Sequence, residues 1–249
     1  IGMLIWGPLS DKYGRKKPLA VEFLLYCAAS LVCMLAWDIY VLLIARLLQG
    51  IGAASATAIS FAMVKDCFSG KTRETVLALV QTISGFGPIL APVVGSWILL
   101  VADWREMFLL LLVFGLIGLV LTLLYEETLP KEERLSGSAF ESFKEIGVVI
   151  QNKSFLWIVL IYSVILIPFY SYINMSSYIF VDFFGCSEQM YSYYYAAVAL
   201  LAMLGPYLYI RFMGNADKNV LTYVCFGVCV LAGVGIVVVG QQSPLVFSV

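Results

Sequence analysis

Residues 7–17 read Gly7-Pro-Leu-Ser-Asp11-Lys-Tyr-Gly14-Arg15-Lys16-Lys17 and separate two apolar stretches, 1–6 and 18–37. A connection this short between two antiparallel helices needs a residue that tolerates positive φ, and Gly14 provides one. Asp11 precedes Arg15 by four residues, so an acid and a base lie close together in this turn. The segment therefore predicts a tight, charged turn between two helices.

The overall composition excludes most soluble classes of protein. Apolar residues make up 62% of the 249 residues and charged residues 12%, whereas soluble domains carry about 25% charged residues. The sequence has no histidine, which rules out a histidine-ligated metal site and a histidine general base. The net charge of −1 offers no basic surface for nucleic acid. The six cysteines are scattered and are interpreted as small buried side chains, so we expect no metal and no cofactor.

Long apolar segments predict an all-α, polytopic transmembrane helical bundle. A helix that spans a membrane needs roughly 20 mostly apolar residues. Seven segments satisfy this requirement: 18–37, 39–64, 75–102, 107–125, 154–181, 189–210 and 219–240. Residues 1–6 are too short to cross and are interpreted as the stub of an earlier helix, and the apolar tail after Gln242 is interpreted as the start of another span.

The distribution of basic residues predicts the orientation and the division of the chain. Thirteen of the fifteen basic residues lie in the alternate loops 7–17, 65–74, 126–153 and 211–218. The positive-inside rule places these loops in the cytoplasm. The long loop predicts a cytoplasmic linker between an N-terminal bundle, 1–125, and part of a C-terminal bundle, 154–249. Within the linker, helical spacing predicts a short amphipathic helix from Phe140, Phe143, Ile146 and Ile150.

Three charged positions need partners. Asp66, at the end of the second span, is the candidate partner of Arg15, and such a pair can break and re-form as helices move. Arg46 lies inside the second span, where an ionised side chain must face a cavity or a partner, either for function or as a structural arginine bonded between helices. Glu22 lies about one turn from Pro18, so we expect its carboxylate to reach the cytoplasmic surface, with proton binding as the alternative.

The motifs resemble those of the major facilitator superfamily. Residues 7–17 resemble its G-x-L-x-D-x-x-G-R-[KR] signature, residues 42–54 its fourth-helix motif around a membrane-buried arginine, and residues 87–95 its antiporter motif on the fifth helix. Asp103-Trp-Arg105 with Phe108, and Glu127-Thr-Leu-Pro130, fit the same family. Pro88-Ile-Leu-Ala-Pro92 and Lys65-Asp66 point toward the bicyclomycin and chloramphenicol resistance (Bcr/CflA) subfamily of drug/proton antiporters.

This resemblance implies that the chain carries the end of the second helix to the ninth helix and the beginning of the tenth, without the first helix and the last two to three helices. The family's key protonatable acid is expected on that first helix. Where the family usually has glycine, this sequence has Ala91 and Ser96. The residues to which the resemblance gives roles are Arg46 and Gln49 for proton coupling, Gly7, Asp11, Gly14, Arg15, Lys16 and Asp66 for a cytoplasmic gate, and Gly87, Pro88, Ala91, Pro92 and Gly95 for the antiporter motif.

Mid-helix aromatic and amide side chains near Pro168 are candidates for a substrate cavity, whereas aromatic side chains at helix ends form interfacial belts. They are Tyr162, Phe169, Tyr172 and Asn174. Such side chains suit amphiphilic or cationic compounds.

The resemblance implies a non-enzymatic transporter of the bacterial inner membrane that exports drugs or small amphiphilic compounds in exchange for protons by alternating access. Its expected partners are a small-molecule substrate, protons and the lipid bilayer, with no nucleic acid, and the full-length protein is expected to be a monomer. A proton-coupled uptake symporter and a non-transporting membrane sensor remain as alternatives.

Overall fold

The computed structural model describes residues 2–54, 56–134, 151–208 and 218–239. The predicted amphipathic helix at Phe140, Phe143, Ile146 and Ile150 lies outside these residues, as do most of the predicted loop 211–218 and the tail after Gln242.

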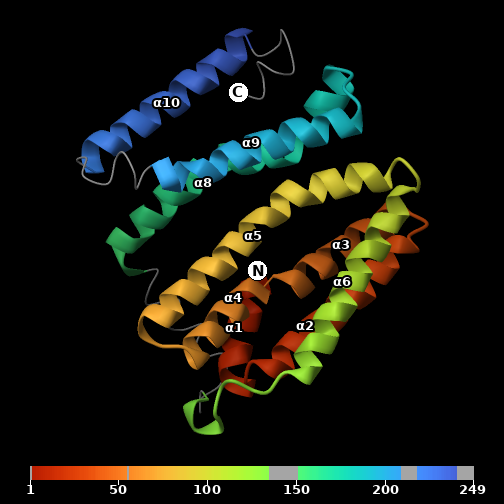
Figure 1. Cartoon of the computed structure of the whole chain (residues 1–249), viewed down its shortest axis with the longest axis vertical. Helices are drawn as coiled ribbons and strands as arrows, with labels where there is room; N and C mark the ends of the chain where they lie inside the picture. Colours follow the sequence, from red (N-terminus) through yellow and green to blue (C-terminus); the bar gives the residue numbers. More distant parts are fainter. Residues whose placement is uncertain (1, 55, 135–150, 209–217, 240–249) are drawn as a thin grey trace. The chain divides into compact units, whose positions relative to one another are not determined.

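Helices account for the regular structure within these ranges, and no strand occurs there (Figure 1). The helices are α1 (Gly2–Tyr13), α2 (Lys16–Met34), α3 (Ile39–Ala53), α4 (Ala56–Cys67), α5 (Gly70–Ile98), α6 (Trp104–Leu124), α8 (Lys153–Tyr178), α9 (Glu188–Leu208) and α10 (Lys218–Val239). A 3₁₀ turn covers Lys131–Glu133, and a π-helical segment, Ile179–Phe183, continues α8. The all-α prediction is confirmed.

The seven predicted spans coincide with helices. The predicted span 39–64 is covered by α3 and α4. Five stretches within the described ranges are long and apolar enough to cross a membrane: Lys16–Met34, Ile39–Cys67, Gly70–Ile98, Trp104–Leu124 and Lys153–Phe183. The helix α9 covers the sixth predicted span but is not among these five, and in α10 the apolar stretch is the shorter Phe226–Gly235.

Local sequence signals explain where the helices begin and end. Gly14 has a φ of +90°, as the turn prediction required, and it separates α1 from α2. Asp38 accepts a hydrogen bond from the backbone N–H of Tyr40 at 3.0 Å and thereby caps the N-terminus of α3. Gly70 and Gly185 also have positive φ, and they lie just before or at the starts of α5 and α9.

The chain packs as two compact units. One is built from residues 1–81 and 101–162, and the other from residues 82–100 and 163–249. The second half of α5 therefore belongs to the same unit as most of α8 and as α9. The predicted division of the chain at the linker 126–153 does not follow these boundaries and stays a prediction.

In the first unit, α2 packs against both α3 and α6 (Figure 1). Three glycines make these close approaches possible: a Cβ at Gly52 of α3 would overlap the backbone of Tyr26, and one at Gly115 or Gly118 of α6 would overlap side chains of α2. Small residues let helix backbones approach closely in a membrane. They bring the polar side chains of α2 and α3 within hydrogen-bonding distance of one another.

The C-terminal end of α3 lies against α1. The indole Nε1 of Trp6 donates a hydrogen bond to the carbonyl oxygen of Ile51 at 2.8 Å. Carbonyl groups in the last turn of a helix lack an intrahelical partner, so a side-chain donor stabilises this end. A Cβ added to Gly2 would overlap Ala54, so α1 lies directly against the end of α3.

In the second unit, a polar contact joins α5 to α9. The hydroxyl groups of Ser96 and Ser192 are hydrogen-bonded at 3.0 Å, and Gln189 Nε2 donates to the carbonyl oxygen of Ser96 at 3.2 Å. Both serines are buried. We call Ser96, Gln189 and Ser192 the Ser96 clasp.

Candidate functional site

The charged turn forms a cluster centred on Arg15. Its Nε donates a hydrogen bond to Asp66 Oδ2 at 2.9 Å, and its Nη1 donates to Asp11 Oδ1 at 2.5 Å. Arg15 is only 7% exposed. The predicted contact between Arg15 and Asp66 is therefore present. We call Asp11, Arg15, Asp66 and Glu127 the latch cluster.

The guanidinium of Arg15 remains charged within the latch cluster. Burial lowers the pKa of this group, but hydrogen bonds and charge attraction from Asp66 and Asp11 outweigh that effect, so the pKa of Arg15 is raised. Ser10 adds a neutral contact, because its hydroxyl accepts from Arg15 Nη1 at 2.9 Å and donates to the carbonyl of Gly7 at 2.8 Å. Gly7 is thus joined to the cluster through Ser10.

Glu127 connects the latch cluster to the end of α6. Its carboxylate accepts hydrogen bonds from the backbone N–H groups of Arg15 at 2.8 Å and Lys16 at 3.3 Å, at the N-terminus of α2. In return, Lys16 Nζ donates to the carbonyls of Leu123 and Tyr125 at 2.8 Å, at the C-terminus of α6. An anion at a helix N-terminus and a cation at a C-terminus both oppose the helix dipole. The two helix ends therefore cap each other.

Gly14 is required for this arrangement in two ways. Its φ of +90° disfavours any residue with a Cβ, and a Cβ at this position would overlap the carboxylate of Glu127. Gly14 was predicted to form the turn and to belong to the cytoplasmic gate. The structure adds that the absence of a side chain makes room for the acid that caps α2.

Arg46 and Gln49 begin a chain of hydrogen bonds between α3 and α2. Arg46 Nη1 donates to Gln49 Oε1 at 2.7 Å, Gln49 Nε2 donates to Ser30 Oγ at 2.7 Å, and Ser30 Oγ donates to the carbonyl of Tyr26 at 2.7 Å. Gln49 and Ser30 are buried, whereas Arg46 is exposed. The ring of Phe108 on α6 lies 5.7 Å from the guanidinium. Arg46 is thus connected to the backbone of α2 by three successive hydrogen bonds, within the apolar part of the bundle.

Glu22 does not reach the cytoplasmic surface, so the favoured interpretation of this residue is wrong. Glu22 is only 1% exposed and lies on the packed face of α2. Its backbone carbonyl is among the atoms closest to Gly52 of α3. Because α3 and α6 pack against α2, the carboxylate cannot extend along a free helix surface as an isolated helix would permit.

The residues of the predicted antiporter motif lie on α5. Pro88 and Pro92 lie inside this continuous helix, together with Gly87, Ala91 and Gly95. Gly87 and Ala91 are exposed, and a Cβ at Gly87 would meet no described atom within 4 Å. The buried residues of this helix are Ile89 and Ser96, and Ser96 contacts α9 through the Ser96 clasp.

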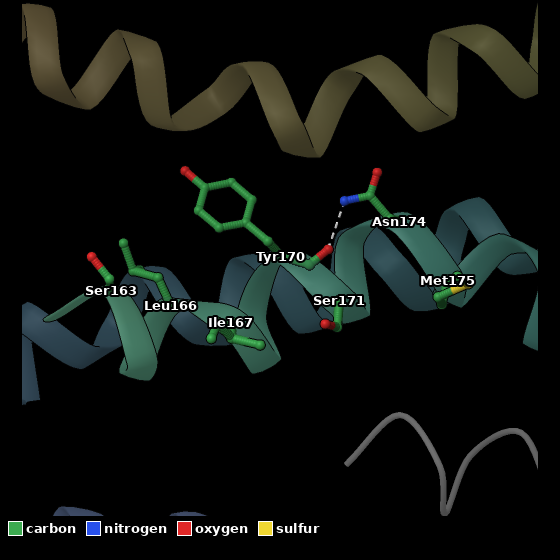
Figure 2. Close-up of a pocket in the computed structure, with 7 residues that line it drawn as sticks. All are labelled: Ser163, Leu166, Ile167, Tyr170, Ser171, Asn174 and Met175. Carbon is green, nitrogen blue, oxygen red and sulfur yellow. Dashed lines mark hydrogen bonds between the residues drawn. The ribbon is translucent and has the colours of Figure 1, made fainter. Parts of the chain in front are cut away.

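The four predicted cavity residues do not lie together. Asn174 lines a hollow of about 520 Å³ on α8, with Ser163, Leu166, Ile167, Tyr170, Ser171 and Met175 (Figure 2). Tyr172 instead stacks on Tyr195 of α9, with ring centroids 6.2 Å apart, and its buried hydroxyl has no hydrogen-bond partner among the described residues. Tyr162 is exposed on α8. The side chain of Phe169 lies outside the described part of the structure.

The hollow has a mixed lining. Figure 2 shows the side chains of Tyr170 and Asn174 on the same side of α8, and Asn174 Nδ2 donates to the carbonyl of Tyr170 at 2.7 Å. Leu166, Ile167 and Met175 supply apolar surface. A surface with apolar side chains and a few polar groups suits an amphiphilic molecule.

Sequence reasoning did not assign roles to Glu127, Ser30 or Ser96. Glu127 belongs to the motif Glu127-Thr-Leu-Pro130, but the sequence carries no local signal for its contact with Arg15, which lies more than a hundred positions earlier. Ser30 shares the face of α2 that carries Tyr26, one turn away, and this spacing could have indicated a polar stripe. Ser96 was noticed only as a departure from glycine.

Comparison with known sequences identifies the family. The sequence profile of the Major Facilitator Superfamily matches residues 1–249. The Bacillus subtilis (strain 168) protein named "Uncharacterized MFS-type transporter YdgK" is 34% identical over 89% of this chain and 56% of its own length.

Two relatives carry a more specific name. "Multidrug resistance protein MdtL" of Klebsiella pneumoniae (strain 342) is 30% identical over 81% of this chain and 50% of its own length. The protein of the same name from Salmonella paratyphi B is 28% identical over 99% of this chain and 62% of its own length. The chain thus spans about half the length of the curated relatives that it matches. With its long apolar helices and a profile match along its whole length, the chain belongs to the Major Facilitator Superfamily, a family of polytopic helical membrane transporters.

Proposed function

We propose that this chain is part of a secondary active transporter that exports small amphiphilic compounds in exchange for protons by alternating access. The relatives named as multidrug resistance proteins support the substrate class. The protein acts without enzymatic chemistry in the inner membrane of a bacterium, as a monomer at full length, and it does not bind nucleic acid. The loops 7–17, 65–74, 126–153 and 211–218 face the cytoplasm.

The observation that carries the proposal is the chain of hydrogen bonds from Arg46 to α2. Arg46 lies seven residues after Ile39, so it is roughly 11 Å along α3 from the start of the helix. A charge at this depth costs at least ~2.5 kcal/mol on insertion scales. The hydrogen bond to Gln49 holds the guanidinium in place, so that it can respond to the charge state of nearby acids.

The latch cluster gives the proposed alternating access a gate on the cytoplasmic side. Arg15 contacts both Asp11 in its own turn and Asp66 at the end of α4. Separation of α1 and α2 from α4 must therefore break the 2.9 Å hydrogen bond between Arg15 Nε and Asp66 Oδ2. Such a pair biases a two-state element, because it is made in one state and lost in the other. The prolines of α5 and the residues Gly87, Ala91 and Gly95 then allow this helix to bend as the cavity changes sides.

The hollow on α8 is the proposed part of the substrate site within the second unit. Tyr170 supplies an aromatic ring and Asn174 an amide group, and both suit a planar amphiphilic compound. Tyr172 supports the aromatic wall by stacking on Tyr195 rather than by lining the hollow.

The test is transport by the whole protein that carries this chain, reconstituted in proteoliposomes with ethidium and a panel of amphiphilic antibiotics. We expect an imposed proton gradient to drive export. Arg46→Ala should lower proton-driven export at least about a hundredfold, on the scale of losing a group that assists proton transfer. The matched control is Arg73→Ala, which removes a cation from an exposed position at the start of α5 and should leave export unchanged.

The outcomes distinguish the alternatives. Export by Arg46→Ala at the rate of the unchanged protein would contradict the coupling role. Proton-driven uptake in place of export would indicate a symporter, and the absence of any flux for the whole panel would indicate a sensor. Retention of folded Arg46→Ala protein, measured by size-exclusion chromatography, separates lost coupling from lost structure.

A further inference from the structure

A second charged group, Glu22, lies within the membrane-embedded part of the first unit. Glu22 is the seventh residue of α2, so it lies roughly 9 Å along the helix from Lys16. It is 1% exposed. Burial of an ionised carboxylate is expensive, so a buried acid that is kept in a membrane helix points to a function that uses its charge.

The position of Glu22 connects it to the Arg46 site. Tyr26 and Ser30 follow it at intervals of four residues, so all three lie on one face of α2. Ser30 accepts a hydrogen bond from Gln49, which in turn accepts one from Arg46. The close approach of α3 at Gly52 lies beside Glu22 and Tyr26. The polar face of α2 therefore runs from the buried acid to the membrane-embedded arginine.

Few other ionisable groups lie on the elements that pack against α2. From α3 the charged group is Arg46. The first turn of α6 carries Arg105 and Glu106. The last turn of α4 carries Lys65 and Asp66, and the last turn of α1 carries Asp11 and Lys12. On α2 itself, Lys16 and Lys17 lie in the first turn, and Tyr26, Cys27 and Cys33 lie further along the helix. Within the apolar parts of these helices, the described charged residues are thus Glu22 and Arg46.

We propose that Glu22 is a proton-binding site of the transporter. This inference rests on the proposed function as a proton antiporter. The protonated, neutral acid is compatible with the closed interface between α2 and α3, whereas entry of water stabilises the carboxylate and releases the proton. The carboxylate and Arg46 attract each other along the polar face of α2. Proton binding at Glu22 thereby changes the charge balance that Gln49 and Ser30 transmit between the two helices.

The first experiment measures coupling in the reconstituted whole protein. We expect Glu22→Gln to lower proton-driven export of ethidium at least about tenfold. Exchange of labelled for unlabelled substrate without a proton gradient should stay within about twofold, because it needs no proton release. Glu22→Asp should keep coupling with a shifted pH profile. Glu74→Gln, which changes an exposed acid near the start of α5, is the control and should behave as the unchanged protein.

Failures of the two proposals can be told apart. Unchanged protein that shows no proton-driven flux contradicts the proposed function. Proton-driven flux that is the same in the unchanged protein and in Glu22→Gln overturns the assignment of Glu22 while the antiporter remains.

The second experiment does not depend on the folding of a variant. Dicyclohexylcarbodiimide labels protonated carboxyl groups in apolar surroundings, and mass spectrometry locates the label. In the unchanged protein we expect labelling of Glu22 to fall as the pH rises between about 5.5 and 8.5, the range that a functional proton site near neutral pH should cover. No label at Glu22, or a label that does not change with pH, would overturn the proposal.

Discussion

The latch cluster and the Ser96 clasp both join helices that are far apart in sequence, but they use different chemistry. The latch cluster holds α2 to α4 and to the end of α6 with full charges, and Arg15 alone contacts Asp11, Asp66 and Ser10. The Ser96 clasp holds α5 to α9 with two hydroxyl groups and one amide. One contact is a network around a cation, and the other is a small neutral set of hydrogen bonds.

This difference has an energetic meaning. Removal of one partner of a buried ion pair leaves the other charge uncompensated, which is strongly destabilising. A neutral hydrogen bond contributes about 1 kcal/mol net, and the loss of one hydroxyl leaves its partner with other acceptors. Making or breaking the latch cluster should therefore decide which of two conformations is stable. The Ser96 clasp should change the stability of a conformation by a smaller amount.

The largest expected effect is that of Arg15→Ala. It leaves Asp66 and Asp11 without their shared cation, so the free energy of unfolding should fall by about 3 kcal/mol. Unfolding by sodium dodecyl sulfate in mixed micelles, followed by circular dichroism, measures this loss. A change below about 0.5 kcal/mol, typical of an exposed surface pair, would show that the cluster is not a structural network.

Charge reversal sharpens this test. The double variant Arg15→Asp with Asp66→Arg should recover more transport than either single variant, because the pair is re-formed in the opposite sense. Recovery should be incomplete, since Asp11 would then lie beside the new acid. A double variant no better than the single ones would contradict the latch.

The next effect concerns Gly14. Gly14→Ala should lower the free energy of unfolding by about 2 kcal/mol, since it combines the cost of a Cβ at positive φ with displacement of the Glu127 carboxylate. Gly70→Ala is the matched control: Gly70 also has positive φ, but among the described residues no atom lies within 4 Å of the added Cβ. Equal losses for the two variants, in the same unfolding assay, would show that the Glu127 contact adds nothing.

The smallest effect concerns the Ser96 clasp. Ser96→Ala and Ser192→Ala should each lower the free energy of unfolding by about 1 kcal/mol. The double variant should lose less than the sum of the two, because both remove the same 3.0 Å bond. A double-mutant cycle in mixed micelles gives this coupling directly, and strictly additive losses would contradict a shared bond.

Hydropathy and turn chemistry predicted much of the fold. The apolar runs predicted the helices, and Gly14 and the charge pair Arg15 with Asp66 were predicted from residues that have few alternative uses in a membrane turn. The contact of Trp6 with Ile51 was not predicted, because such a tertiary contact has no local signal in the sequence.

The facing of side chains was harder to predict. Tyr172 was predicted to line a cavity, but it packs against α9, since rotation of a helix about its axis is set by its neighbours. Glu22 was expected at the surface because the side chain of an isolated helix can extend to water. The packing of α3 and α6 against α2 prevents this. Residue type predicted which positions matter, and packing decided where they point.

The mutual capping of α2 and α6 also constrains biosynthesis. The N–H groups that open α2 are satisfied by Glu127, which follows Arg15 by 112 positions. At synthesis rates of about 5–20 residues per second, Glu127 is made on the order of ten seconds after Arg15. During that interval the N–H groups that open α2 lack the carboxylate that caps them. The first unit can close only once the chain has been made past α6.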